Sequence, residues 1–207
     1  MKKFKFLLLS ACIALVACTT KTSSEQQVSD KGTKWSWDKG TIVVETPERP
    51  AEQTSVIGLT IPKMEVVRVG FVGLGMRGPG AVERFTYIPG VEIVALCDYE
   101  KERAEKCQKY LQRASMPKAA IYSGEKGYEE LCKRDDIDLV YIATDWLHHF
   151  PVAMCAMENN KNVAIEVPSA MDLKECWALV NMSEKTRKHC MIPVSYTHLT
   201  LPTNSRV

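Results

Sequence analysis

The segment that most constrains the fold is a glycine-rich turn between an expected strand and an expected helix. Residues 65–72 are rich in β-branched side chains, which is typical of a buried strand. They lead directly into Gly73-Leu-Gly-Met-Arg-Gly78, and Pro79 then suits the first turn of a helix. A second apolar run, 91–97, ends at Asp98, which lies 20 positions after Gly78. This spacing is that of the first β-α-β unit of a dinucleotide-binding fold.

Each residue of this pattern has a physical role in holding a dinucleotide. Gly73 allows the tight turn, Gly75 lets the backbone approach a pyrophosphate, and Gly78 permits close packing of the helix on the strand. The start of the helix offers N–H groups and a partial positive charge to the phosphates. Asp98 is placed to accept hydrogen bonds from the adenine ribose, and its charge would repel the 2′-phosphate of NADP. The pattern therefore predicts NAD as the cofactor. Arg77 weakens the preference for NAD over NADP slightly, because a nearby arginine could meet a phosphate. The alternative is a glycine turn with a purely structural role.

The remaining chain alternates between helical and strand patterns. The expected helices are 79–86, 99–113, 127–134, 150–160 and 172–188, and the further strands are 137–144 and 162–168. This order predicts the α/β class, with a Rossmann-type doubly wound parallel sheet and right-handed crossovers. Ligands of such sheets bind at the carboxyl ends of the strands. We therefore expect residues 73–78, 145–149 and 166–168 to share one edge.

Composition and cysteine spacing exclude several other classes of protein. Hydrophobic residues make up 45 %, charged residues 25 %, and the net charge is +2, which is ordinary for a globular protein and gives no reason to expect a nucleic-acid partner. Six of the eight cysteines lie beyond the first 18 residues, without C-x-x-C pairs or zinc-ligand spacing. We expect neither a metal site nor an obligatory disulfide framework. Cys97, Cys155 and Cys176 lie in apolar stretches and are expected to be buried.

The first 17 residues have the pattern of an export signal. Lys2, Lys3 and Lys5 precede the apolar run 6–17, which is too short to span a bilayer as a helix. The run ends in Leu-Val-Ala-Cys18, which resembles the lipobox of bacterial lipoproteins, where the cysteine takes a diacylglycerol after cleavage. We expect an exported domain held at a bacterial membrane only by the lipid on Cys18. A simple secretory peptide and an uncleaved N-terminus are the alternatives.

The chain divides into four segments of different character. These are a signal peptide (1–17), a tether and extended lead-in (18–64), the dinucleotide-binding domain (65–192) and a C-terminal tail (193–207). The tether assignment rests on the polar composition of residues 19–39. Residues 194–203 are similar to the translation of a sequencing-adaptor DNA, so we expect a foreign tail and a longer parent protein. A natural loop and strand is the alternative.

Several motifs together resemble one family of sugar-active proteins. The matching segments are 67–82, 95–98, 136–149, 163–168 and 187–191. They resemble the glucose–fructose oxidoreductase, inositol dehydrogenase and rhizopine-catabolism superfamily (Gfo/Idh/MocA) and, more narrowly, glycoside hydrolase family 109, the NAD-dependent α-N-acetylgalactosaminidases. The dehydrogenases carry Glu-Lys-Pro where this chain has Glu166-Val167-Pro168, and valine can neither donate nor accept a proton. Family 109 carries this same Glu-Val-Pro.

The resemblance implies contacts with NAD in all three segments of the edge. It assigns Met76 and Arg77 to the pyrophosphate, Asp98 to the ribose, Trp146, His148 and His149 to the nicotinamide side, and Glu166 and Val167 to the nicotinamide ribose and ring. Trp146 is alternatively a core aromatic, and either histidine is alternatively a residue at a helix start.

The implied reaction is hydrolysis of an α-N-acetylgalactosaminide glycan without net redox change. Bound NAD⁺ takes a hydride from C3 of the sugar, elimination releases the glycosidic oxygen, water adds, and the hydride returns. The family holds its acid/base residues in a C-terminal α/β substrate domain that is missing here. We therefore assign no catalytic residue and expect poor solubility and negligible turnover from this chain. A fragment of a sugar oxidoreductase and a non-catalytic dinucleotide-binding lipoprotein are the alternatives, and the oligomeric state stays open.

Overall fold

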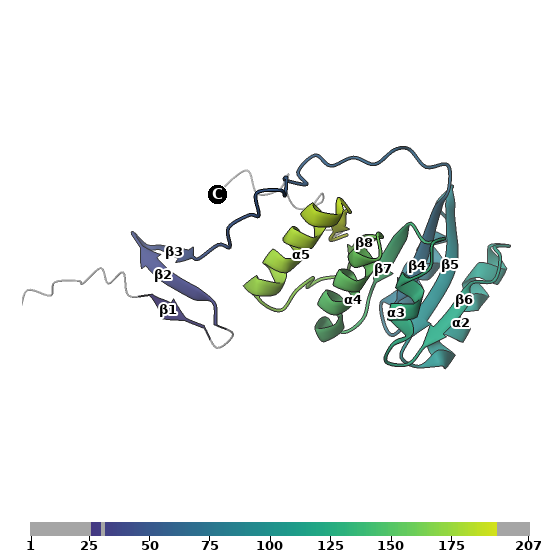
Figure 1. The fold of residues 1–207 in the computed structure, drawn as a ribbon. Helices are drawn as coiled ribbons and strands as arrows, with labels where there is room; N and C mark the ends of the chain where they lie inside the picture. The colour runs from purple at the N-terminus through teal and green to yellow at the C-terminus, as the bar shows by residue number, and fades with distance from the viewer. Residues whose placement is uncertain (1–25, 30–31, 194–207) are drawn as a thin grey trace, which may run out of the picture. The chain divides into compact units, whose positions relative to one another are not determined.

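A six-stranded parallel sheet forms the centre of the part of the chain that follows residue 46. In the computed structural model, which describes residues 26–29 and 32–193, the strand order is β6-β5-β4-β7-β8-β9 (Figure 1). The strands are β4 (Val67–Val72), β5 (Val91–Asp98), β6 (Ala120–Ser123), β7 (Leu139–Ile142), β8 (Asn162–Ile165) and β9 (Cys190–Met191). Every neighbouring pair is parallel, and the order reverses between β4 and β7. This arrangement confirms the predicted doubly wound sheet of the Rossmann type.

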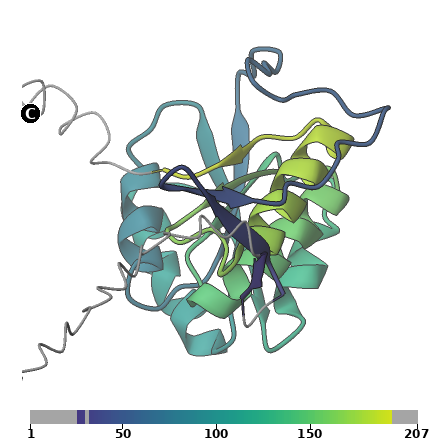
Figure 2. The ribbon, with the colours of Figure 1, turned by 90° about the vertical axis from the view of Figure 1, so that its left-hand side faces the viewer.

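Helices cover both faces of the sheet, as Figure 2 shows. The helices are α1 (Gly78–Phe85), α2 (Lys101–Arg113), α3 (Gly127–Cys132), α4 (Trp146–Glu158) and α5 (Leu173–Thr186). Alternate strand residues point to opposite faces, so Phe71 packs in the cluster under α1 and α2, and Val72 in the cluster under α3, α4 and α5. Both clusters are almost free of polar side chains, which explains why the strands are apolar on both faces.

The structure adds two strands to the predicted sheet and moves one helix start. The strands β6 and β9 were not expected, because β6 is not part of a longer apolar run like those of residues 137–144 and 162–168, and β9 has only two residues. Helix α4 begins at Trp146 rather than Phe150, since the carboxylate of Asp145 caps it by accepting the N–H groups of Leu147 and His148. Segment 145–149 is therefore a capped helix start.

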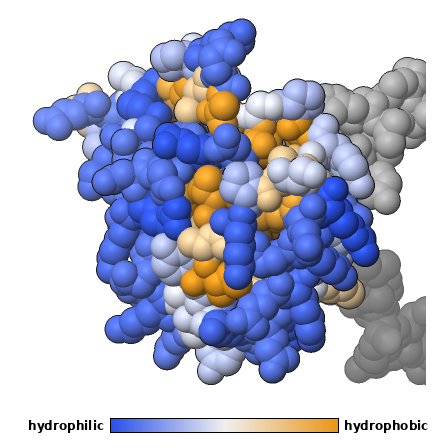
Figure 3. Space-filling view, turned by 90° about the vertical axis from the view of Figure 1, so that its right-hand side faces the viewer, coloured by the Kyte–Doolittle hydropathy of each residue, from blue (hydrophilic) through white to orange (hydrophobic). Residues whose placement is uncertain are grey.

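The β6 edge carries a broken band of apolar residues between hydrophilic ones, as seen from that side in Figure 3. A cleft of about 370 Å³ opens there, and its lining includes Ile93, Met116 and Ala120. The edge strand itself is only four residues long, which limits the backbone available for pairing with another chain.

The described residues before 47 form a separate unit with an antiparallel sheet of β1 (Gln27–Val28), β2 (Lys34–Asp38) and β3 (Thr41–Val44). The predicted solvated tether, residues 19–39, therefore includes strands β1 and β2. Lys39 and Gly40 both have positive φ, 47° and 81°, which is the backbone of a two-residue hairpin turn. Trp35 and Trp37 alternate with polar residues, which is the pattern of a strand. The polar composition of residues 19–39 as a whole does not show this alternation.

The lead-in from residue 47 runs back along α5 and is fixed to it by two arginines. The guanidinium of Arg49 donates to the buried carboxylate of Glu184 at 2.9 Å. Arg187, just after α5, donates to the carbonyl oxygen of Thr54 at 2.8 Å. The lead-in therefore belongs to the larger unit, whose boundary lies before residue 65.

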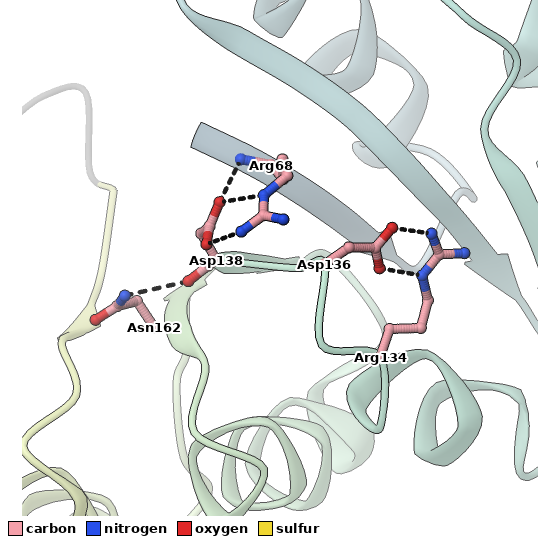
Figure 4. Close-up of polar contacts among 5 residues, drawn as sticks. All are labelled: Arg68, Arg134, Asp136, Asp138 and Asn162. Atoms are coloured by element: carbon pink, nitrogen blue, oxygen red, sulfur yellow. Dashed lines mark hydrogen bonds and ion pairs between the residues drawn. The ribbon is translucent and has the colours of Figure 1, made fainter. Parts of the chain in front are cut away.

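Ion pairs join the amino ends of the strands (Figure 4). The Arg68 side chain donates to both carboxylate oxygens of Asp138 at 2.9 Å, and Asn162 donates to the Asp138 carbonyl at 3.1 Å. Arg134 and Asp136 form a second paired contact beside them. These contacts connect the starts of β4, β7 and β8, so this edge is occupied by structural interactions.

Some sequence predictions are corrected, and others lie outside the described residues. Cys176 is exposed rather than buried, because it lies on the outer side of α5; Cys97 is buried, and Cys155 is partly buried. Within the described residues all six cysteines are free, and no helix is long and apolar enough to cross a membrane. The signal peptide, Cys18 and the tail from residue 194 are not among the described residues.

Candidate dinucleotide-binding site

The three glycines of the turn are required for different reasons. Gly73 has φ of 91°, and a Cβ there would lie 2.5 Å from the backbone of Ala143. A Cβ at Gly78 would lie 2.0 Å from the carbonyl oxygen of Gly73. A Cβ at Gly75 would meet only the Arg103 guanidinium, at an ordinary 3.7 Å. The packing of the chain thus explains Gly73 and Gly78, whereas Gly75 leaves a free approach to the backbone that suits a pyrophosphate.

The start of α1 is an uncompensated positive end beside this approach. Its N-cap residue, Arg77, makes no side-chain capping bond, and the first turn contains no acidic residue. The neighbouring Met76 is 94 % exposed. Unpaired N–H groups and the helix dipole at such an end favour a bound anion.

Asp98 is buried and holds the glycine turn in place. Its Oδ2 accepts a hydrogen bond from the backbone N–H of Leu74 at 2.6 Å, and its Oδ1 accepts one from Glu100 at 3.0 Å. The Arg103 guanidinium lies 3.6 Å from Oδ1. The sequence pattern alone does not reveal this anchoring role. Carboxylate oxygens have further lone pairs, so the predicted ribose contact is compatible with it and stays a prediction.

A cleft of about 620 Å³ lies at the carboxyl ends of the strands and joins two of the predicted segments. Its lining includes Gly73, Asp98, Tyr99, Tyr128, Asp145 and His148. Both tyrosines are absent from the predicted site, whereas Asp145 begins the predicted segment 145–149 but is assigned no cofactor contact. Tyr99 directly follows Asp98 and so lies at the same strand end, and this position is the sequence signal that could have assigned it to the site.

The start of α4 presents one exposed and one buried histidine. His148 is exposed, and its Nδ1 lies 2.7 Å from Asp145 Oδ2. Although burial opposes it, this contact and the N–H groups that Asp145 accepts lower the pKa of its carboxyl group. His149 is 1 % exposed, and its Nδ1 lies 2.6 Å from the carbonyl oxygen of Pro168. His148 is therefore available to a ligand, whereas His149 connects α4 to the segment after β8.

Glu166 and Val167 follow β8 at the same edge. Glu166 Oε1 accepts a hydrogen bond from the Tyr141 hydroxyl at 2.6 Å. Val167 is 54 % exposed and Trp146 is 59 % exposed, so two large apolar groups face solvent close to the sheet edge. Among the described residues, no group of three or more His, Cys, Asp or Glu could hold a metal ion.

Comparison with known proteins supports an NAD-binding fold. A family model described as "Oxidoreductase family, NAD-binding Rossmann fold" (GFO_IDH_MocA) matches residues 67–194, and this match confirms the predicted cofactor, NAD. The solved structure of a myo-inositol dehydrogenase from Lactobacillus casei, in complex with NAD(H) and myo-inositol, is similar with a TM-score of 0.53 and 27 % identity. That match covers 63 % of this chain and 37 % of the dehydrogenase.

Proteins named glycosyl hydrolase family 109 are much more similar in sequence. Protein 5 of that name from Phocaeicola vulgatus is 75 % identical over 93 % of this chain and 37 % of its own length. Protein 1 from Bacteroides thetaiotaomicron is 58 % identical over 90 % of this chain and 39 % of its own length. These relatives bear out the predicted resemblance, and the chain spans less than two fifths of their length.

Proposed function

Because this chain belongs to the Gfo/Idh/MocA family of NAD-binding oxidoreductases, we propose that it is the NAD-binding part of a longer glycosidase that hydrolyses α-N-acetylgalactosaminides. The observation that carries the glycosidase over a dehydrogenase is Val167. It stands exposed where the family's dehydrogenases have a lysine, and it cannot transfer a proton to or from a sugar hydroxyl. The names of the relatives support the same choice.

We place NAD on the carboxyl edge in one orientation. The backbone at Gly75 and the start of α1 would receive the pyrophosphate, and Asp98 the adenine ribose. Glu166 would meet the nicotinamide ribose, and Trp146 and Val167 would exclude water near the ring. Bound NAD would supply a hydride acceptor that is restored within each turnover.

This chemistry does not require the paired carboxylates of ordinary glycosidases. The chain's own residues bind and orient the cofactor, and the groups that move protons on the sugar belong to the remainder of the parent protein. We therefore expect negligible turnover from the 207 residues alone.

The deciding experiment is an assay of the intact parent protein on an α-N-acetylgalactosaminide. Release of the sugar without net accumulation of NADH supports the glycosidase. Stoichiometric NADH supports a sugar oxidoreductase instead, and NAD binding with neither product supports a non-catalytic lipoprotein. A Gly75→Val variant is the control, because blocking the pyrophosphate should abolish either activity.

We also propose that the protein is exported and attached through a lipid on Cys18. A redox-neutral cycle suits a compartment without a cytosolic pool to recycle NADH. Labelling of growing cells with a fatty-acid analogue tests the attachment. The label should be lost in a Cys18→Ala variant and kept in Cys12→Ala, and a label that survives Cys18→Ala rules the anchor out.

A further inference from the structure

Tyr141 carries a buried hydroxyl that none of the predicted cofactor contacts includes. The strand register places Tyr141 beside Ala164 of β8, and Glu166 lies two residues further along on the same face. The Tyr141 hydroxyl donates to Glu166 Oε1 at 2.6 Å, a length typical of a charge-assisted hydrogen bond. The contact reaches from the core to the carboxylate at the sheet edge.

The ring that carries this hydroxyl has little freedom to move. Tyr141 is 4 % exposed and packs against Phe71 and Phe85, with ring centroids 5.2 and 5.3 Å away. Burial, followed by the hydrogen bond and charge of Glu166, raises the pKa of Tyr141 despite the opposing effect of Arg84. The hydroxyl therefore stays protonated near neutral pH and remains a donor in a fixed position.

We propose that Tyr141 is a positioning residue whose hydroxyl orients the Glu166 carboxylate toward the nicotinamide half of NAD. The bond engages Oε1 and leaves Oε2 for a ribose hydroxyl. A glutamate held in this way loses less side-chain freedom when the cofactor binds, so more of its contact contributes to affinity. The proposal rests on the proposed function, because the contact between Glu166 and the nicotinamide ribose belongs to that function.

The test compares the affinity of the full 207-residue chain for NAD⁺ and for ADP, which lacks the nicotinamide half. Tyr141→Phe keeps the aromatic packing and removes the donor, so NAD⁺ should bind about 3- to 10-fold more weakly. The affinity for ADP should not change. Tyr122→Phe is a matched control, since its hydroxyl contacts Arg134 at 3.3 Å, and neither affinity should change in it.

A double-mutant cycle with Glu166→Ala shows whether Tyr141 acts through Glu166. Glu166→Ala should weaken NAD⁺ alone, and adding Tyr141→Phe should cause no further loss. Equal weakening of NAD⁺ and ADP by Tyr141→Phe would show a packing role and overturn the proposal. So would an unchanged NAD⁺ affinity in either single variant, or additive losses in the double variant. If the unmodified chain binds neither ligand, the proposed function itself fails, which is a distinct result.

Discussion

The ring of His149 links the start of α4 to the segment after β8, because its Nδ1 lies 2.6 Å from the carbonyl oxygen of Pro168. The ring is 1 % exposed, so water has little access to replace the contact. Two segments of the site that are separate in the sequence thus hold one geometry through a single buried side chain.

The adjacent histidines should therefore differ in their effect on stability. His149→Ala removes a buried hydrogen bond and leaves a cavity, so the free energy of unfolding should fall by about 1–3 kcal/mol. His148→Ala affects only an exposed pair with Asp145 and should change it by about 0.5 kcal/mol or less. Denaturant unfolding of both variants measures the difference. Equal losses would contradict the structural role of His149.

Two glycines of the turn should separate folding from binding. A side chain at Gly73 collides with the backbone of Ala143 in a left-handed conformation, so Gly73→Ala should lower the melting temperature strongly. The Cβ of a side chain at Gly75 would meet only the Arg103 guanidinium, at 3.7 Å, so Gly75→Val should leave melting nearly unchanged while it blocks the approach of the pyrophosphate. We expect a loss of NAD⁺ affinity of about 10-fold or more, measured by calorimetry. Retained affinity in Gly75→Val would place the pyrophosphate elsewhere.

The sequence predicts those parts of this fold whose signals are local. The glycine spacing and Asp98 lie within one β-α-β unit, so both the turn and its position follow directly from the pattern. The bond between Tyr141 and Glu166 depends on the pairing of β7 with β8, and that register is not written in either strand alone. The sequence pattern predicts the start of this helix at residue 150, whereas the helix is capped by Asp145. The pattern alone therefore does not distinguish the buried His149 from the exposed His148.

The ion pair at the opposite edge should give stability that depends on pH. Burial alone would raise the pKa of Asp138, but the hydrogen bonds and charge of Arg68 outweigh it and hold the pKa below its ordinary value of 3.8. A depressed folded-state pKa contributes stability above the unfolded-state pKa, and this is lost as the pH falls through the folded-state value.

Asp138→Asn should thus melt about 2–6 °C lower than the unmodified chain at neutral pH. The gap should shrink as the pH falls below about 4. Thermal melts across this range check the trend. The carboxylate of Asp136 is more exposed than that of Asp138, so Asp136→Asn should show a smaller difference in melting temperature. The NAD⁺ affinity should not change in either variant. A gap that widens in acid would contradict this account of the pair.

Asp98 should influence both the loop and the choice of cofactor. Asp98→Ala leaves the backbone N–H of Leu74 without its buried acceptor and removes the charge that repels a 2′-phosphate. The affinity for NAD⁺ should fall by about 10-fold or more, and the affinity for NADP⁺ should fall less. Titration with both cofactors gives the ratio. An unchanged preference would mean that Asp98 serves only to anchor the turn.

Trp146 offers an optical test of where the nicotinamide ring binds. The chain has four tryptophans, and Trp146 is 59 % exposed at the start of α4, within the predicted nicotinamide side of the site. Binding of NADH should quench tryptophan emission and sensitise nicotinamide emission through energy transfer, which falls steeply with distance. Trp146→Phe should remove most of the sensitised signal and leave the NADH affinity within about 3-fold, since one aromatic replaces another. Trp37→Phe, at a similarly exposed position in the N-terminal sheet, should keep the signal. Loss of the sensitised signal in Trp37→Phe and its survival in Trp146→Phe would show that the nicotinamide ring does not bind near the start of α4.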